Sequence, residues 1–493
     1  MNMDKPVRRV AIFGMLLFFA LMAQINYVQG SQAEKLQTDK NNTRRFAEVF
    51  NSPRGEIIAA NGEVLALSKP TGDDNPKYGR TYKDGPVFSP VTGYFNGGAS
   101  KVELAYNSLL GGTDKRITHQ RWFDTFIGKK AEGANVELAL NPTAQRIAHR
   151  ELKSSTSRRA GAAVIDVRTG AVVVLATSQD FDPNEVAPQT GSKGGTRLAQ
   201  LDNAQGVIKP LIDNAMSQTF PPGSSFKIVA TALGIEDLGL NASSTVDTSP
   251  LTLPESGQLL PNSHDGGSCA GRAPLSGAFA ESCNTSFGRI ALDLGIDKLS
   301  DGAKRFGFGE PVRLDQDIRV ATSDVPKSIK DVASGKDIPT GKDGTARSGI
   351  GQENVRATPL QMAMVAAAVA NKGKIMQPYL VQNVRAKDQS SLYEASPKLF
   401  STAMKSDTAS QIADMMREVV SKGTATNLQG HDIAGKTGTA EQGAGIPNAR
   451  WFVGFGPSEN PRYAFAVMTE GTGDGAHGAG PVAAAIMDQV LKK

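Results

Sequence analysis

The run PPGSSFK, residues 221–227, says most about how the largest part of the chain is built. Two prolines and a glycine end a loop, and the apolar residues from Phe226 onward predict a helix that begins there. Ser224 then lies at the N-terminus of this helix, where backbone N–H groups favour developing negative charge. Ser224 and Lys227 are three positions apart, so their side chains share one face of the helix.

Ser224 is a candidate nucleophile, and Lys227 is the candidate base that would activate it. A serine hydroxyl attacks only when a neighbouring group takes its proton. A free lysine has a pKa of about 10.4, which is too high for this role near neutral pH. Burial and a second cation nearby would lower that pKa. A Ser-x-x-Lys pattern is weak evidence by itself, because chance alone produces about one or two in a chain of this length.

Two later segments carry side chains that suit the same chemistry. In Ser282-Cys283-Asn284, the hydroxyl could relay a proton and the amide could orient the backbone of a substrate. In the run GKTGTA, residues 435–440, Lys436 offers a cation for an anionic group and the threonines offer hydrogen bonds. A glycine in such a strand permits another backbone to approach closely. Read singly, each segment has an ordinary structural explanation: Ser-x-Asn is a very common sequence, and GKTGTA could be an edge strand that carries an exposed lysine.

The three segments together, in this order, mark β-lactamases and penicillin-binding proteins. The chain also resembles class B penicillin-binding proteins at Arg54–Ile57 (RGEI), which is similar to their N-terminal signature, and at residues 349–352 (GIGQ) and 358–363 (TPLQMA). Within that family it most resembles the actinobacterial penicillin-binding protein A type. Cys283 stands where the usual second motif has aspartate, a change that other transpeptidases of the family tolerate.

The resemblance implies an α+β fold with four consecutive regions. Residues 1–9 form a cytoplasmic tail, 10–28 a transmembrane anchor, and 29–150 a smaller non-catalytic α+β domain of the dimerisation or pedestal type. Residues 151–493 form a penicillin-binding, serine β-lactamase-like transpeptidase domain, an antiparallel sheet flanked by helices.

Local patterns agree with this division. β-Branched runs at 161–167 and 171–177 flank a glycine-containing turn and predict a hairpin. Residues 451–455 and 463–468 read as neighbouring strands, and 481–491 as a closing helix. The polar stretches 185–205 and 321–346 are expected to be loops.

The N-terminus predicts export of everything that follows it. Lys5, Arg8 and Arg9 precede an apolar run from Val10 to Val28, and positive charge before such a run keeps the N-terminus in the cytoplasm. The 19 residues of this stretch approach the length of about 20 that spans a bilayer. The alternative is a cleaved signal peptide with small residues such as Ser31 and Ala33 at the cleavage site.

The resemblance implies D,D-transpeptidation of peptidoglycan. Ser224 would attack the D-alanyl-D-alanine carbonyl with Lys227 as base, and an amine of a neighbouring stem peptide would resolve the acyl-enzyme. Ser282 and Lys436 would shuttle the proton to the leaving group, and Asn284 would position the substrate. The remaining implied roles are substrate binding by Thr437, Gly438 and Thr439, and an oxyanion hole made by the backbone N–H groups of Ser224 and Thr439.

Alternative functions are a D,D-carboxypeptidase, which uses water as acceptor, a β-lactamase, and a non-catalytic β-lactam sensor or scaffold. No metal or organic cofactor is expected, since no Cys-x-x-Cys occurs and the five histidines lack metal-ligand spacing. β-Lactams, a membrane glycan polymerase and division or elongation proteins are the expected partners. The net charge of +5 does not indicate nucleic-acid binding, because no basic run exceeds a pair.

Cys269 and Cys283 are the only cysteines, and an exported chain meets an oxidising compartment. We therefore expect them to form a disulfide, which would fix the residue between Ser282 and Asn284. The alternative is a pair of buried free thiols.

Overall fold

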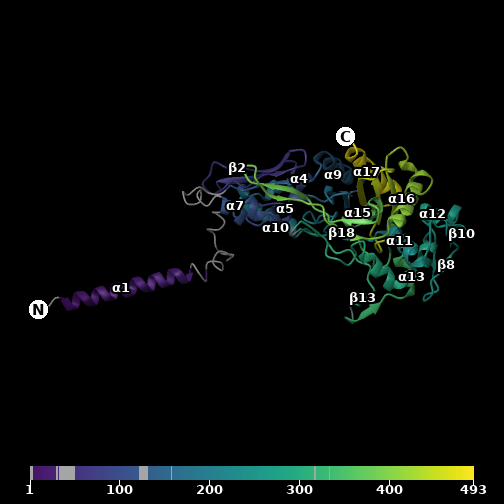
Figure 1. Ribbon diagram of the computed structural model, residues 1–493, viewed down its shortest axis with the longest axis horizontal. Helices are drawn as coiled ribbons and strands as arrows, with labels where there is room; N and C mark the ends of the chain where they lie inside the picture. The colour runs from purple at the N-terminus through teal and green to yellow at the C-terminus, as the bar shows by residue number, and fades with distance from the viewer. Residues whose placement is uncertain are drawn as a thin grey trace.

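Two large β-sheets and the helices packed on them make up most of the body of the molecule, seen in a computed structural model (Figure 1). The structure describes residues 4–28, 32, 50–120, 132–156, 158–315, 318–331 and 334–492. Ser31 and Ala33, which belong to the signal-peptide alternative, lie outside these residues.

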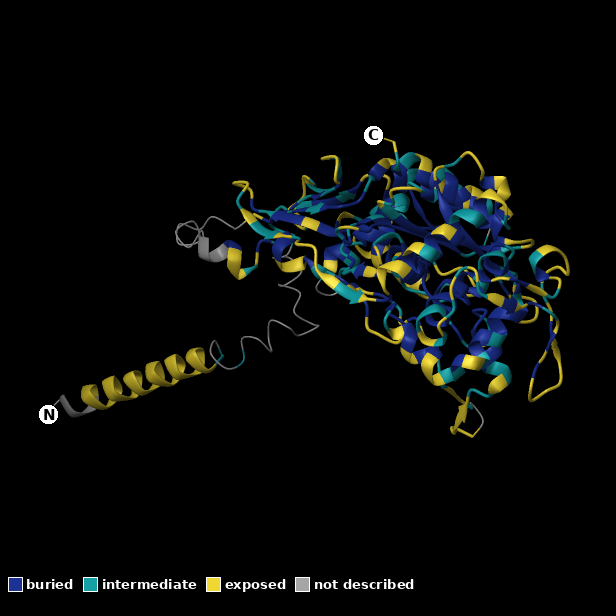
Figure 2. Cartoon of the chain, turned by 45° about the vertical axis from the view of Figure 1, so that its right-hand side comes forward, coloured by how far each residue is buried: buried dark blue, intermediate teal, exposed yellow. Residues whose placement is uncertain are grey.

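Helix α1 (Asp4–Tyr27) contains residues 10–27 of the predicted anchor and stands apart from the body (Figure 1). Its residues Val7–Tyr27 are long and apolar enough to cross a membrane, by length and composition. The helix is exposed along this length (Figure 2). Exposed Leu, Phe and Met side chains on every side are typical of a segment whose surroundings are lipid.

The central sheet has five antiparallel strands in the order β19-β20-β21-β5-β6. Their bounds are β19 Ala434–Ala440, β20 Asn448–Gly456, β21 Tyr463–Gly471, β5 Ala160–Asp166 and β6 Val172–Thr177. The predicted hairpin is confirmed as β5 and β6, and the predicted neighbouring strands as β20 and β21. β19, which carries the third motif, is an edge strand of this sheet.

Helices cover the central sheet because its strands are apolar on both faces. All seven residues of β5 are buried, which requires cover on each side. α15 (Pro359–Ala370) packs on β21 and β5, while α17 (Gly475–Val490) packs on β20 and on α9 (Pro142–Ser155). α9 begins where Asn141 accepts the N–H groups of Thr143 and Ala144.

The second sheet has six strands and joins distant parts of the chain. Its order is β17-β16-β4-β1-β2-β3, with β17 Ser391–Glu394, β16 Val381–Arg385, β4 Asn135–Leu138, β1 Ile57–Ile58, β2 Val64–Pro70 and β3 Tyr78–Tyr82. β16 and β17 follow α15 in the sequence, so the C-terminal half completes the N-terminal sheet. The predicted domain boundary at residue 150 falls inside α9, which packs with the central sheet.

A buried ionic cluster holds the N-terminal sheet to its helices. Glu103 on α5 (Lys101–Ala105) accepts from Arg54 Nε at 2.7 Å and from Arg80 Nε at 2.7 Å. Tyr82 donates its hydroxyl to the same carboxylate at 3.1 Å. Burial opposes ionisation, but the two guanidinium groups outweigh it, so the pKa of Glu103 lies below its usual value.

Two predicted loops contain regular structure instead. Residues 185–205 include the helix α10 (Ser192–Asp202), because Leu198 and Leu201 pack on a small cluster with Phe181 and Val186. The adjacent glycines 194–195 have low helix propensity, so the local sequence does not predict this helix. Residues 321–346 include a hairpin, β13 (Ser328–Lys330) with β14 (Asp337–Pro339), and the start of α14 (Lys342–Ser348). The closing helix α17 begins six residues before the predicted start at Pro481.

The remaining helices and strands connect the two large sheets and the helices packed on them. They are α4 Gly85–Thr92, α6 Asn107–Leu110, α7 Lys115–Gln120, η2 Pro183–Val186, η3 Pro188–Thr190, η4 Gly223–Phe226, α11 Lys227–Leu238, β7 Thr245–Asp247, β8 Leu251–Thr252, β9 Leu259–Leu260, η5 Gly267–Cys269, β10 Arg272–Pro274, α12 Leu275–Ala280, α13 Asn284–Lys304, β11 Arg313–Leu314, β12 Ile318–Arg319, β15 Lys374–Met376, β18 Leu399–Thr402, α16 Ser406–Ser421 and η6 Thr426–Leu428.

Glu103→Ala is expected to destabilise the protein strongly, because it leaves two guanidinium groups buried without their carboxylate. Removing one member of a buried pair typically costs about 3–5 kcal/mol. The matched control is Glu137→Ala, which removes a half-exposed pair with Arg385 in the same sheet and should cost about 1 kcal/mol or less. Urea unfolding of each variant gives both values. Equal losses for the two variants would contradict a special role for the cluster.

Candidate active site

Ser224 lies in the 3-10 turn η4, which leads directly into α11 and Lys227. Gly223 adopts φ +54°, a left-handed conformation that suits glycine, and its N–H donates to Gly351 O at 2.9 Å. Trp451 Nε1 donates to Pro221 O at 2.8 Å. These contacts fix the entrance to the turn, so Ser224 is half-buried and presented toward a pocket.

The second motif sits at the junction of α12 and α13. Ser282 has φ +63°, which is uncommon for a residue with a side chain, and Asn284 begins α13. Lys227 Nζ donates to Ser282 O at 2.7 Å, to Ser282 Oγ at 3.2 Å and to Asn284 Oδ1 at 2.9 Å. Among the described residues, no hydrogen bond joins Lys227 to Ser224 Oγ.

The third motif lies on the edge strand β19, directly against η4. A Cβ added at Gly438 would lie 2.7 Å from Pro222 O and 3.0 Å from Ser225 N, so only glycine fits there. A Cβ added at Gly223 would lie 2.6 Å from Thr439 O. The two motifs therefore pack backbone against backbone, which explains the glycine between Thr437 and Thr439.

Two buried lysines dominate the electrostatics of the site. Lys227 and Lys436 are both 0% exposed. Burial, and then the charge of Lys436, hold the pKa of Lys227 well below its usual value. Burial lowers the pKa of Lys436 to about 7. The rings of Phe287 and Phe279 lie 5.3 Å and 5.7 Å from the two ammonium nitrogens, so apolar walls replace water around both groups.

A pocket of about 300 Å³ gathers the polar side chains of all three motifs. Five residues singled out in the sequence, Ser224, Ser282, Asn284, Thr437 and Thr439, line it, whereas Lys227 and Lys436 are fully buried. The sequence did not single out six further lining residues: Ser263, Ile350, Gln352, Thr424, Asp474 and Ala476.

Two of these additional residues lie in a segment that already supported the family resemblance. Ile350 and Gln352 belong to the GIGQ segment that the family resemblance includes, so that segment could have been assigned to the site. Thr424 contacts Thr437 through their hydroxyls at 2.7 Å, and Ser263 follows β9. No local pattern marks either of them, because only the tertiary fold brings their loops to the pocket.

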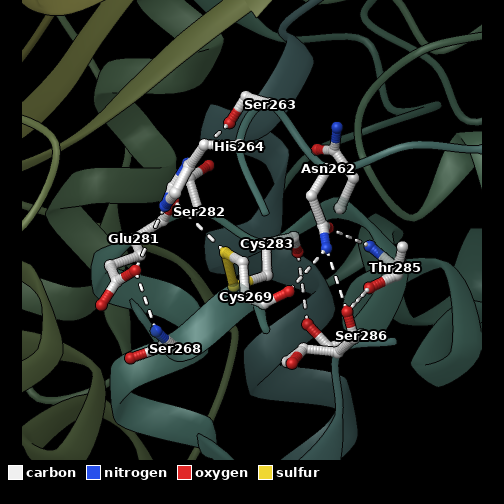
Figure 3. The surroundings of a disulfide bond; sticks show 12 residues. Asn262, Ser263, His264, Ser268, Cys269, Glu281, Ser282, Cys283, Thr285 and Ser286 are labelled. Atoms are coloured by element: carbon white, nitrogen blue, oxygen red, sulfur yellow. Dashed lines mark hydrogen bonds and ion pairs between the residues drawn. A yellow bond between two sulfur atoms is a disulfide. The ribbon is translucent and has the colours of Figure 1, made fainter. Parts of the chain in front are cut away.

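Cys269 and Cys283 form a disulfide beside the second motif, with their Cα atoms 5.3 Å apart (Figure 3). The bond ties η5 to the residue between Ser282 and Asn284. Asn262 reinforces the same region, since its amide donates to Cys269 O and its carbonyl accepts from Thr285 N. The disulfide and Asn262 thus stabilise the segment in which Ser282 adopts its left-handed conformation.

Three side chains of metal-binding type, His264, Cys269 and Glu281, lie together at this disulfide. The sulfur of Cys269 is bonded to Cys283, so it is not a free thiolate ligand. His264 Nε2 is 3.2 Å from Glu281 Oε2, and Ser268 N donates to the same oxygen at 3.0 Å. Through these contacts Glu281 holds the segment that contains His264 and Ser268, which is a structural role.

Family comparison agrees with this geometry. The penicillin binding protein transpeptidase domain model matches residues 160–492, which is more than half of the chain. The chain belongs to the penicillin-binding protein transpeptidase family. The penicillin binding protein A dimerisation domain matches residues 54–136.

Relatives in this family match along nearly the whole chain. The peptidoglycan D,D-transpeptidase PbpA of Mycolicibacterium smegmatis is 32% identical over 96% of this chain and 95% of its own length. The protein of the same name from Mycobacterium tuberculosis is 30% identical over 99% of both chains. The predicted resemblance to the penicillin-binding protein A type is confirmed.

Solved structures confirm the predicted fold. The ceftriaxone acyl-enzyme complex of penicillin-binding protein A from M. tuberculosis has a TM-score of 0.81 and 27% identity, and the match covers 90% of this chain and 100% of that chain. The penicillin G acyl-enzyme complex of the same protein has a TM-score of 0.80 and 28% identity over 90% and 100% of the two chains. The α+β transpeptidase fold is therefore shown.

The disulfide predicts that unreduced, denatured protein contains no free thiol, and that reduction releases two. A double Cys269→Ser, Cys283→Ser variant should lose up to about 3 kcal/mol of unfolding free energy, the chain-entropy value for a loop of this size. Thiol counting and urea unfolding measure the two effects. Two free thiols before reduction would refute the bond in solution.

Proposed function

We propose that this protein is a peptidoglycan D,D-transpeptidase that cross-links stem peptides through an acyl-enzyme at Ser224. The observation that carries the proposal is the pair of buried lysines beneath a pocket that Ser224 lines. Such burial adds nothing to stability and suits a base that must be uncharged near neutral pH. Relatives named as D,D-transpeptidases over the full length of the chain support the same reaction.

Lys227 is the general base in this proposal. As a neutral amine it has two N–H donors, which Ser282 O and Asn284 Oδ1 accept. Its lone pair is then directed at a hydroxyl, either Ser282 Oγ at 3.2 Å or Ser224 Oγ once substrate has entered. A lysine without its proton can take one from serine, whereas an ammonium cannot.

Acylation joins Ser224 Oγ to the carbonyl carbon of the penultimate D-alanine, and the bond to the terminal D-alanine nitrogen breaks. The proton taken from Ser224 passes through Ser282 and Lys436 to that nitrogen, which leaves as an amine. Lys436 suits this transfer because a pKa of about 7 lets it both give and accept a proton near neutral pH.

The edge strand β19 is the proposed substrate platform. An edge strand has unpaired backbone groups on its outer side, which can pair with an extended peptide. Backbone N–H groups of Ser224 and Thr439 form the proposed oxyanion hole, since Gly223 brings these two segments into contact. Thr437, Gly438 and Thr439 would hold the terminal carboxylate, and Asn284 would orient the peptide backbone.

The second candidate is a D,D-carboxypeptidase, in which water replaces the acceptor amine. The same site would catalyse both reactions, so the pocket favours neither. The N-terminal sheet and the full-length match to transpeptidases favour cross-linking. A silent sensor or scaffold would not need two lysines buried beside a serine.

The location that fits this reaction is the outer face of the cell membrane. Lys5, Arg8 and Arg9 precede the apolar run within α1, which favours a cytoplasmic N-terminus and a catalytic domain outside the cell. A membrane glycan polymerase of the division or elongation machinery would supply the glycan strands. β-Lactams would acylate Ser224 as substrate mimics.

Penicillin is expected to form a covalent adduct of one molecule per chain, located on Ser224. Ser224→Ala should abolish the adduct, while Ser225→Ala, in which a buried neighbouring hydroxyl is lost, keeps the nucleophile. Intact mass and peptide mapping after incubation measure the adduct. Labelling that persists in Ser224→Ala would exclude this serine.

The rate of penicillin acylation should rise with pH and level off well below the ordinary pKa of lysine, because the base is Lys227 without its proton. Lys436→Gln removes a like charge, so the pKa of Lys227 increases and the rising limb moves to higher pH. Second-order acylation rates across the pH range give the midpoint independently of the maximal rate. An unchanged midpoint in Lys436→Gln would contradict the coupling of the two lysines.

A further inference from the structure

Asp474 brings a carboxylate to the pocket that the three motifs line. It stands between β21 and α17 and caps α17, where it accepts the His477 N–H at 2.9 Å. The start of the helix packs on the third motif: a Cβ added at Gly475 would lie 2.6 Å from Gly438 O. Among the described residues that line the pocket, Asp474 is the sole carboxylic acid.

The carboxylate is charged and open to a ligand. Burial opposes its ionisation, but the backbone N–H and ring of His477 outweigh this, so the pKa of Asp474 is below its usual value. Its side chain is 57% exposed, and its ion-pair partner among the described residues is the exposed His477. Arg450, the nearby guanidinium on β20, donates instead to Thr472 O at 2.8 Å.

The proposed reaction brings two substrates of opposite charge to this pocket. The donor peptide ends in a carboxylate, which suits Lys436 and the threonine hydroxyls of β19. The acceptor contributes a primary amine, which is mostly an ammonium ion near neutral pH. A carboxylate in the pocket lining attracts an ammonium ion and repels another carboxylate, so Asp474 distinguishes the two ligands by charge.

We propose that Asp474 binds the ammonium group of the acceptor and so selects amine acceptors over water. This inference rests on the proposed transpeptidase function. In the transfer step, the bound ammonium first gives one proton to water, and the amine nitrogen then bonds to the acyl carbon. The bond from that carbon to Ser224 Oγ breaks, and the second amine proton goes to Ser224 Oγ.

A role as helix cap alone would not need the charge, because asparagine caps helices as well as aspartate does. Asp474→Asn therefore separates the two roles. Asp488→Asn is the matched control, since Asp488 lies on the same helix, pairs with His431 at 3.0 Å in the same way, and is not part of the pocket lining.

The test measures the ratio of transfer to hydrolysis for full-length protein in detergent, with a D-alanyl-D-alanine donor peptide. One acceptor is a stem-type peptide with a side-chain ammonium, and the other is hydroxylamine, which is uncharged near neutral pH. Asp474→Asn is expected to lower the ratio about fivefold for the ammonium acceptor and to leave it unchanged for hydroxylamine. Asp474→Glu should keep most of the preference, and high salt should reduce the wild-type preference toward that of Asp474→Asn.

An unchanged ratio with the ammonium acceptor would overturn the inference, and so would an equal loss with hydroxylamine or in Asp488→Asn. A loss confined to acylation by the donor would also overturn it, because the carboxylate would then act on the first substrate. Penicillin labelling of Ser224 separates this result from failure of the proposed function. If wild-type protein forms no adduct, both proposals fail, whereas a labelled Asp474→Asn that still prefers the ammonium acceptor refutes only this one.

Discussion

The site is built around two buried lysine side chains, Lys227 and Lys436, which are close enough for their charges to interact. Taking an ammonium group out of water is costly, so Lys227 and Lys436 both lose their protons more easily than free lysine does. The unfolded chain binds more protons at these positions than the folded chain does. Stability therefore falls as the pH decreases from about 10 toward 7. In the proposed function, this unfavourable arrangement supplies the uncharged base that activates Ser224.

The surrounding structure keeps the arrangement rigid. Gly438 and Gly223 let β19 and η4 touch through their backbones, and Trp451 ties the strand beside β19 to the loop before Ser224. The disulfide holds the segment in which Ser282 adopts its left-handed conformation. Strain of this kind persists only where neighbouring contacts enforce it. The site thus depends on contacts between segments far apart in the sequence.

The sequence was most informative where a local pattern has one structural solution. β5 and β6 followed from β-branched runs around a glycine turn. α10 was missed because Leu198 and Leu201 become a packing face only once Phe181 is in place. The strands β16 and β17 could not be assigned to the N-terminal sheet, since pairing with β4 joins residues about 250 positions apart. For the same reason, Thr424 and Asp474 gave no sign that they line the pocket.

The proposed mechanism requires that burial and the charge of Lys436 hold the pKa of Lys227 well below its usual value. NMR titration of protein that carries ¹³C-labelled lysine side chains tests it directly, with Lys227→Arg and Lys436→Gln to assign the two signals. We expect one lysine that titrates near pH 7, lost in Lys436→Gln, and a second that titrates well below the ordinary value, lost in Lys227→Arg. If every lysine titrated near its ordinary pKa of about 10.4, Lys227 would be protonated near neutral pH and could not act as the base.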